Sequence, residues 1–357
     1  MKQKSKILVA LVLLVSILLV ACGGSTTTTT AGTTTGTTAA PGTTTAPGGS
    51  APATKKDKYV VGFSQVGSES EWRIAMTKEV QAAYEKHPRF ELIFSDAQQK
   101  QENQITAVRN FIQQKVDAIL LCPVVATGWD AVLTEAKEAK IPVLIVNRRA
   151  TMAAGKIEEY TATYIGPDNI YAGELAANTM LDIFKDKEGP IGTVLLEGTV
   201  GASSAVDRAK GIDNVLKGQT KLEVLYKQSG DYTRSKGKEV MESILKSAKA
   251  DGKKIEALLS HSDDMAIGAS QAIEEAGLKP GEDIKIIGID GVRGAFEAMV
   301  AGKYSATVEN PLGYGDKTIE VLLAMLDEGK MPEEWVKLKN NLFTQDQAAA
   351  ALPNRTY

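Results

Sequence analysis

Cysteine and histidine are scarce in this chain of 357 residues, which contains two of each. Cys22 follows an apolar N-terminal segment, and Cys122 lies in the apolar stretch at residues 119–123, so a framework of several disulfides is excluded. His87 and His261 are far apart and have neither C-x-x-C nor H-E-x-x-H spacing around them. We therefore expect Cys122 to be a buried, unreactive thiol, and we predict no metal site.

Signatures of catalysis and of phosphate binding are also missing. The sequence has no G-x-S-x-G elbow, no Walker loop and no G-x-G-x-x-G after its first apolar strand. The glycine turn at residues 198–203 lacks the rest of a phosphate motif, and we interpret it as a tight loop between a strand and a helix. Carboxylates do lie close together at residues 69–71 and 263–264, and a glycosidase needs two carboxyl groups about 5–10 Å apart. Neighbours along a chain usually point apart, so we expect a protein without catalytic residues or cofactor and keep glycoside cleavage as the alternative.

Only one hydrophobic run is long, and it lies at the N-terminus. Three lysines precede an apolar stretch at residues 7–21, which is short for a membrane span of about 20 residues. A basic start followed by a short apolar core is typical of a secretory signal. Residues 19–22 (LVAC) resemble a bacterial lipobox, which implies cleavage before Cys22 and lipidation of its sulfur. We expect a signal peptide at residues 1–21 and a protein anchored to the outer face of the cell membrane, with an uncleaved anchor as the alternative.

The next segment has almost no large apolar side chains. Residues 23–53 are nearly all Thr, Gly, Ala, Pro and Ser, so burial cannot offset the entropy of ordering them, and we predict a disordered tether over residues 22–57. Residues 1–21 hold three lysines and no acid, which leaves 38 basic residues against 44 acidic ones in the rest of the chain. This acidic balance argues against nucleic acid as a partner.

Short apolar runs alternate with helix-like stretches through the remaining 300 or so residues. Continuous Val, Ile and Leu runs between amphipathic helices are typical of parallel sheets covered on both faces. Two such series predict an α/β protein with two doubly wound lobes. The expected strands lie at residues 60–63, 92–94, 118–121, 143–146, 193–196, 224–226, 257–259 and 284–289, and the expected helices begin at Trp72 and lie near residues 102–115, 128–140, 169–185, 204–217, 233–249, 264–276, 292–301 and 312–328.

The first of these units ends its strand in a Gly/Ser loop that opens a helix. Ser68 and Glu71 have the S-x-x-E spacing of a capping box. In an open α/β sheet, ligands bind at the carboxyl ends of the strands, and Glu69, Trp72 and Arg73 are placed there. The stretch is consistent both with a binding site and with a capped helix whose tryptophan begins a core stripe.

Polar clusters follow strand after strand along the chain. In two facing lobes these clusters line one cleft. Carboxylates and guanidinium groups make charge-assisted hydrogen bonds to sugar hydroxyls, and an aromatic ring covers the apolar face of a sugar. A single member such as Asp263 or Asp290 also suits a helix cap, but six clusters at strand ends favour a sugar site. The clusters are Ser64-Gln65, residues 96–99, Asn147-Arg148, Glu197-Gly198, residues 262–264 and Asp290-Gly291.

With these motifs, the chain resembles periplasmic-type sugar-binding proteins of the ribose-binding family, which serve ABC importers, and most of all their galactofuranose-binding branch. The likeness spans nearly all of residues 58–357. It implies the type I periplasmic binding protein fold, with two Rossmann-like lobes joined by three hinge crossings. The matching stretches are residues 62–73, 98–105, 123–129, 198–203, 233–243, 263–265, 276–281 and 289–291.

The resemblance also implies lobe boundaries and hinge positions. The first lobe is expected to comprise residues 58–166 plus 311–333, and the second residues 167–310 plus 334–357. The crossings are expected near Gly166, at Glu309 and Asn310, and near Trp335.

Carried over residue by residue, the resemblance assigns a sugar site to both lobes. Trp72 is expected to stack on the ring, while Glu69 and Arg73 bind its hydroxyls. The complete set of expected sugar-binding residues is Glu69, Trp72, Arg73, Asn147, Arg148, Arg208, Ser262, Asp263 and Asp290.

Two of these positions depart from the family pattern. Asn147 stands where the family has Asp before the arginine, and Ser262 stands where it has Asn before the Asp pair. An amide in place of a carboxylate loses a charge-assisted hydrogen bond worth about 1.5–3 kcal/mol. We therefore expect affinity or sugar preference to differ from that of the branch.

The function that the resemblance implies is that of a lipid-anchored, non-enzymatic receptor, expected to be a monomer. It would bind a monosaccharide, galactofuranose or a related furanose or pyranose, and deliver it to a membrane permease and its ATPase. The alternative is an extracytoplasmic sugar sensor for a kinase or chemoreceptor. Related repressors are excluded, because the chain begins with a secretion signal in place of a helix-turn-helix.

Overall fold

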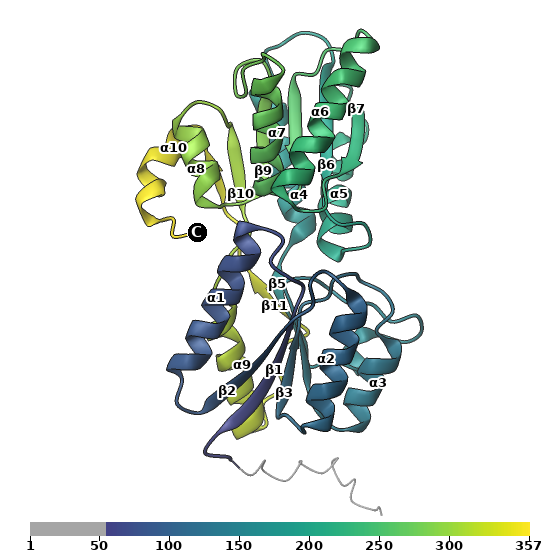
Figure 1. Cartoon of the computed structure of the whole chain (residues 1–357), viewed down its shortest axis with the longest axis vertical. Helices are drawn as coiled ribbons and strands as arrows, with labels where there is room; N and C mark the ends of the chain where they lie inside the picture. Colours follow the sequence, from purple (N-terminus) through teal and green to yellow (C-terminus); the bar gives the residue numbers. More distant parts are fainter. Residues whose placement is uncertain (1–54) are drawn as a thin grey trace, which may run out of the picture. The chain divides into compact units, whose positions relative to one another are not determined.

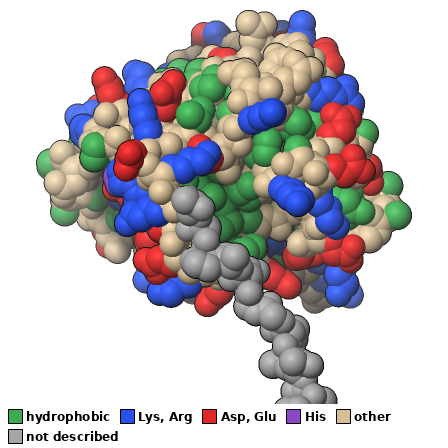
Figure 2. All heavy atoms as spheres, turned by 90° about the horizontal axis from the view of Figure 1, so that it is seen from below, with side chains coloured by type: hydrophobic (Ala, Val, Ile, Leu, Met, Phe, Trp, Pro, Cys, Tyr) green, Lys and Arg blue, Asp and Glu red, His purple; other side chains and the backbone are tan. Residues whose placement is uncertain are grey.

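The computed structural model describes residues 55–357, so the expected signal peptide, the lipidation site Cys22 and most of the tether lie outside the described residues. Within residues 55–357, no helix has the length and apolar character needed to cross a membrane. The face seen in Figure 2 carries Lys and Arg side chains interspersed with Asp and Glu, which matches the mixed charge of the composition.

The first sheet has six strands in the order β11-β5-β4-β3-β1-β2, and all neighbours pair in parallel (Figure 1). Every residue of β3 and β4 is buried, because helices cover both faces of the sheet. The strands are β1 (Tyr59–Gln65), β2 (Phe90–Asp96), β3 (Ala118–Leu121), β4 (Val143–Val146), β5 (Thr163–Pro167) and β11 (Trp335–Leu338).

Two pairs of helices cover this sheet. Helices α1 (Glu71–Lys86) and α9 (Tyr314–Glu328) pack together on one face, and α2 (Gln101–Gln113) and α3 (Asp130–Glu138) pack together on the other (Figure 1). Successive strand residues alternate between the two cores, since Leu120 packs with the first pair, and Ile119 and Leu121 with the second.

The second sheet also has six strands, in the order β12-β10-β9-β8-β6-β7. Its pairs are parallel except for β12, which runs antiparallel to β10 at the edge. The strands are β6 (Ile191–Glu197), β7 (Leu222–Ser229), β8 (Ala257–Ser260), β9 (Lys285–Asp290), β10 (Ala306–Glu309) and β12 (Leu342–Thr344).

Helices α4 (Asn169–Ile183) and α5 (Ser203–Leu216) cover one face of the second sheet. Gly211 lets their backbones meet, because a Cβ at this position would lie 2.0 Å from the carbonyl oxygen of Ile170. The other face carries α6 (Arg234–Ala250), α7 (Asp263–Glu275) and α8 (Arg293–Val300), against which α10 (Gln345–Ala351) packs. Two short 3-10 turns complete the fold, η1 (Ile157–Glu159) and η2 (Leu352–Asn354).

The two-lobed α/β architecture expected from the sequence is confirmed, and each of the eight expected strands overlaps an observed one. Strands β5 and β10, which lead into the first two crossings at Gly166 and at Glu309-Asn310, were not among the expected strands.

The expected position of β11 is wrong. Residues 335–338 were assigned to the second lobe, but β11 pairs in parallel with β5 in the first sheet. Trp335 holds it there, since its Nε1 donates to the carbonyl oxygen of Gly166 (2.9 Å) and its ring packs against Tyr164 (centroids 6.0 Å apart). The third crossing therefore lies between β11 and β12, after Trp335. The other lobe boundaries stay a prediction.

Candidate functional site

Helix α1 begins at the end of the loop after β1 and presents Trp72 and Arg73. Its N-cap is Ser70, which has extended backbone torsions and whose side chain accepts a hydrogen bond from the Arg73 N–H (3.1 Å). The predicted capping box of Ser68 and Glu71 is therefore wrong, because the helix starts two residues later than that spacing requires. Trp72 and Arg73 lie on the buried side of the first turn.

Glu69 connects two arginines of the first lobe. Its Oε1 accepts from Nε of Arg73 (3.1 Å) and from Nη2 of Arg148 (3.2 Å), and all three side chains are at most 4% exposed. Burial alone would raise the pKa of Glu69, but the two guanidinium groups outweigh it and hold the pKa below its ordinary value. Glu69 is therefore an ionised acceptor with a fixed position.

Arg73 is held on its other side by Asn147, which follows β4. Nη2 of Arg73 donates to Oδ1 of Asn147 (3.0 Å), and the Asn147 amide nitrogen donates to the hydroxyl of Tyr314 (3.1 Å). Nη1 of Arg73 faces two weak acceptors, Sγ of Cys122 (3.3 Å) and Sδ of Met76 (3.2 Å). Cys122 is buried, as expected. Among the described residues, Glu69 is the only carboxylate bonded to Arg73.

Trp72 joins the first lobe to a crossing. Its Nε1 donates to the backbone carbonyl of Asn310 (2.6 Å), and its ring meets the edge of Tyr314 with centroids 6.2 Å apart. The ring is 2% exposed and lies 5.1 Å from the guanidinium carbon of Arg73. The same contacts thus fix the aromatic side chain and link it to an expected hinge residue.

Arg208 and Asp290 face these groups from the second lobe. Nε of Arg208 donates to Oδ1 of Asn169 (3.0 Å), and Nη1 donates to the carbonyl of His261 and lies 3.6 Å from Oδ1 of Asp290. Burial raises the pKa of Asp290 to about 8, although Arg208 acts in the opposite direction. Asp290 also has a φ of +147°, a conformation that non-glycine residues rarely adopt and that is concentrated at functional sites.

These side chains meet around one buried cavity of about 20 Å³, which is room for roughly one water molecule. Residues of both lobes close around this cavity. A ligand larger than a water molecule therefore requires the two lobes to move apart. Seven of the nine predicted sugar-binding residues line the cavity. The lining consists of Glu69, Ser70, Trp72, Arg73, Asn147 and Arg148 from the first lobe, Ser204, Arg208, Tyr232 and Asp290 from the second, and Asn310 at the crossing.

Three atoms of the lining are buried without a hydrogen-bond partner in the described structure: Oε2 of Glu69, Nε of Arg148 and Oδ1 of Asn310. Buried polar groups are nearly always paired, so unpaired ones around a single cavity indicate a polar ligand. A carboxylate oxygen only accepts and a guanidinium N–H only donates, and a hydroxyl can satisfy either. The arrangement therefore suits a ligand with several hydroxyl groups.

Ser262 and Asp263 do not line the cavity. Ser262 caps α7 through a bond from the Met265 N–H (3.3 Å). The Asp263 carboxylate is turned inward, where it accepts hydrogen bonds from the N–H groups of Gly291 (2.7 Å) and Val292 (3.1 Å) and from the hydroxyls of Tyr304 and Thr307. Asp263 therefore holds the loop that follows Asp290. Ser262 is a helix cap, the alternative that was considered for single members of these clusters.

The predicted site lacks Ser70, Ser204 and Tyr232, which line the cavity, and Asn310 was predicted only as a hinge residue. Tyr232 follows β7, an edge strand whose end was not among the six predicted polar clusters, and Ser204 directly follows the glycine turn at residues 198–203. Both could have been found from the same rule that selected the other strand ends.

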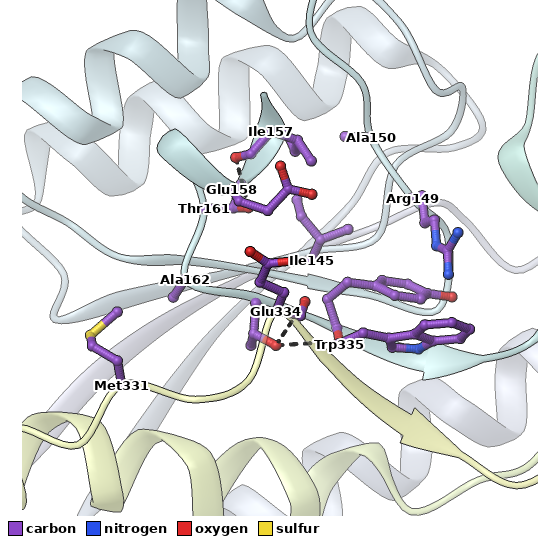
Figure 3. Close-up of a pocket in the computed structure, with 12 residues that line it drawn as sticks. Ile145, Arg149, Ala150, Ile157, Glu158, Thr161, Ala162, Met331, Glu334 and Trp335 are labelled. Carbon is purple, nitrogen blue, oxygen red and sulfur yellow. Dashed lines mark hydrogen bonds between the residues drawn. The ribbon is translucent and has the colours of Figure 1, made fainter. Parts of the chain in front are cut away.

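A larger pocket of about 440 Å³ lies elsewhere in the first lobe and shares no residue with the buried cavity (Figure 3). Arg149 lies there over the rings of Trp335 (4.4 Å) and Tyr164 (4.8 Å). Within residues 55–357, no group of three His, Cys, Asp or Glu side chains is arranged to hold a metal ion.

Comparison with known proteins places most of this chain in a family. The family profile described as "Periplasmic binding protein domain" matches residues 61–331. The galactofuranose-binding protein YtfQ of Escherichia coli is 45% identical over 83% of this chain and 91% of its own length.

Two solved structures are similar over the whole fold. A Mycobacterium smegmatis protein in complex with β-D-fucofuranose is 41% identical, with a TM-score of 0.79 over 84% of this chain and 95% of that one. The binding component of the arabinose ABC transporter from Shewanella sp. ANA-3, bound to L-arabinofuranose, is 44% identical, with a TM-score of 0.78 over 83% of this chain and 95% of that one. This chain belongs to the periplasmic binding protein domain family.

Proposed function

We propose that this protein is the solute-binding component of an ABC sugar importer and holds a furanose in the cavity between its lobes. The main support for this proposal is the cavity, where buried charged groups from both lobes converge and three polar atoms have no hydrogen-bond partner in the described structure. The family is one of binding proteins, which confirms the expectation of a non-enzyme.

The cavity offers the chemistry that a small sugar requires. Arg73 and Arg148 present donors and Glu69 an acceptor from the first lobe, while Arg208 and Asp290 do so from the second. Trp72 would cover the apolar C–H face of the ring. Three relatives named for galactofuranose, fucofuranose and arabinofuranose support a furanose over a pyranose.

Sugar binding would stabilise the closed arrangement. Contacts from both lobes are complete only when the lobes are together, so the ligand shifts the equilibrium toward closure. Motion at Gly166 and at Glu309 and Asn310 would open the cavity, and a permease that recognises the closed form would then receive only loaded protein.

Lipidation at Cys22 would hold the receptor at the outer face of the membrane. The receptor is proposed to be a monomer. Labelling of cells with a fatty acid, compared with a Cys22→Ala variant, tests the anchor: label on the wild type alone supports it. Recovery of the wild-type protein free in the medium contradicts it.

Two alternative functions, a sugar sensor and a glycosidase, can be distinguished from a transport protein by experiment. A sensor for a kinase or chemoreceptor would bind the same sugar, and deletion of the neighbouring permease genes would leave its response intact. A glycosidase would cleave furanoside oligomers and lose this activity in Asp263→Asn. The structure gives little support to that role for Asp263, since its carboxylate is bonded within the second lobe and outside the cavity.

Titration calorimetry with galactose, D-fucose and L-arabinose, extended to ribose, fructose and glucose, tests the proposal. Binding of at least one sugar that forms a furanose, with one site per chain, is the expected result. The absence of heat with every one of these sugars would contradict a furanose receptor.

A further inference from the structure

The cavity contains one pair of neutral hydroxyls that the proposed function does not use. Ser204, in the first turn of α5, and Tyr232, in the loop after β7, lie with their hydroxyl oxygens 2.9 Å apart, and both are buried. Among the described residues, each hydroxyl has only the other as its hydrogen-bond partner. Two hydroxyls carry two protons, so one proton and several lone pairs stay available to a ligand.

The fold positions Tyr232 at some cost. Asp231 and Tyr232 have φ values of +54° and +60°, in the left-handed region that side chains other than glycine rarely occupy. The ring packs so closely on Gly198 that a Cβ there would lie 2.0 Å from Cζ of Tyr232. Strain of this kind persists where the surroundings impose it and is concentrated at functional sites.

The ring also contacts arginines of both lobes. The guanidinium carbon of Arg148 lies 5.1 Å from the ring centroid and that of Arg208 lies 5.9 Å from it. Since Arg148 comes from the first lobe, this contact exists only when the lobes are together. The hydroxyl pair is therefore part of the closed cavity.

The pair differs chemically from the arginines and from the ionised Glu69 of the lining. Arginines only donate and an ionised carboxylate only accepts, and their fixed positions match the adjacent hydroxyls of a rigid ring. A hydroxyl pair can donate or accept, and its protons rotate. It therefore matches a hydroxyl at the end of a rotating chain, such as the exocyclic tail of a hexofuranose.

We infer that Ser204 and Tyr232 are specificity-determining residues that bind O6, the terminal hydroxyl of a hexofuranose tail. This inference rests on the proposed function. The sugars named for the relatives allow a direct comparison, because galactofuranose has hydroxyls at C5 and C6, D-fucofuranose has a methyl group at C6, and L-arabinofuranose ends at C5. Only galactofuranose presents O6.

The test is calorimetry of Tyr232→Phe and Ser204→Ala with galactose, D-fucose and L-arabinose. The furanose fraction of each free sugar is the same in every titration, so it cancels when the Kd of a variant is divided by that of the wild type. Loss of one neutral hydrogen bond in a buried site predicts galactose binding about 5- to 30-fold weaker in each variant. The Kd values for fucose and arabinose should change less than about 2-fold.

Matched controls are Tyr226→Phe, whose hydroxyl bonds Asp251 at the surface, and Ser247→Ala, an exposed position on α6. Thermal unfolding confirms that each variant folds, and Ser204→Ala leaves the strained turn at Tyr232 untouched. Equal losses for all three sugars, or no loss for galactose, overturn the inference while leaving the proposed function standing. Failure of the wild type to bind any of the three overturns the proposed function itself.

Discussion

Asp264 of the second lobe accepts a hydrogen bond over 2.7 Å from the backbone N–H of Glu71, the first residue of α1 in the first lobe. The first N–H groups of a helix have no partner within it, and the helix dipole favours a negative charge at that end. Arg234 completes the bridge, since its Nη2 lies 2.8 Å from Oδ1 of Asp264 and 2.8 Å from Oε1 of Glu71. One lobe therefore caps a helix of the other.

We predict that Asp264→Asn speeds release of the sugar. The change removes the charge from a contact that exists only between closed lobes, so the closed state loses more stability than the open state. About 1 kcal/mol of that difference corresponds to roughly 5-fold faster dissociation. Stopped-flow fluorescence measures the rate, and Asp186→Asn, in an exposed loop, is the control. An unchanged dissociation rate contradicts the role of the bridge.

Trp72 should matter for both folding and binding. Trp72→Ala removes a 2% exposed ring and is expected to lower the free energy of unfolding by about 3–5 kcal/mol. Trp72→Phe keeps an aromatic face and loses the bond to Asn310, so it should fold with a smaller loss and retain measurable sugar affinity. Urea denaturation and calorimetry on both variants separate the effects. Normal affinity in a folded Trp72→Ala would exclude stacking.

Asn147→Asp restores the carboxylate of the family pattern beneath Arg73. The bond from the charged Nη2 of Arg73 (3.0 Å) would gain an ionised acceptor and become an ion pair, and the second carboxylate oxygen can accept from the Tyr314 hydroxyl. We expect a gain of about 1 kcal/mol in the free energy of unfolding at pH 7. The gain should disappear at low pH, as the new carboxylate becomes protonated. Urea denaturation at both pH values measures it, and a loss of stability at pH 7 would show that the site favours the amide.

Asp290 should couple stability to pH. Its pKa is raised from 3.8 to about 8, chiefly by burial, so between these values the folded state holds a proton that the unfolded state has released. Stability from this group is therefore fully present below about pH 4 and falls as the pH rises to 8, with a limiting slope of about 1.4 kcal/mol per pH unit.

The measurement is the free energy of unfolding of the wild type minus that of Asp290→Asn, between pH 5 and 8. The difference should fall with rising pH. Asp263, whose burial raises its pKa to about 6, titrates in both proteins, so the subtraction removes its own contribution and leaves its effect on Asp290, whose pKa it raises further. A difference that is flat or rises with pH contradicts the protonated state of Asp290.

Local features were predictable because they depend on short stretches of chain. Apolar runs and helical spacing located eight of the twelve strands of the described structure and most helices, and the rule that ligands bind at strand ends selected Glu69, Arg148 and Asp290. These features require only the period of the apolar pattern and the direction of a parallel strand.

Which way a side chain turns at a strand end was not predictable in the same way. Asp263 and Asp290 follow neighbouring strands, yet Asp263 turns inward to bind the loop after β9 while Asp290 lines the cavity. The inward position of the Asp263 carboxylate is held by the hydroxyls of Tyr304 and Thr307, about 40 residues further along the chain, which donate to it.

The sequence by itself determined the two-lobed α/β class and most of the charged groups of the site, because periodicity and strand polarity are local properties. Only the tertiary structure decided that β11 pairs in the first sheet, that Asp264 caps α1, and that Ser204 meets Tyr232. Each of these joins segments far apart in the chain or in different lobes, and no local pattern encodes such a contact.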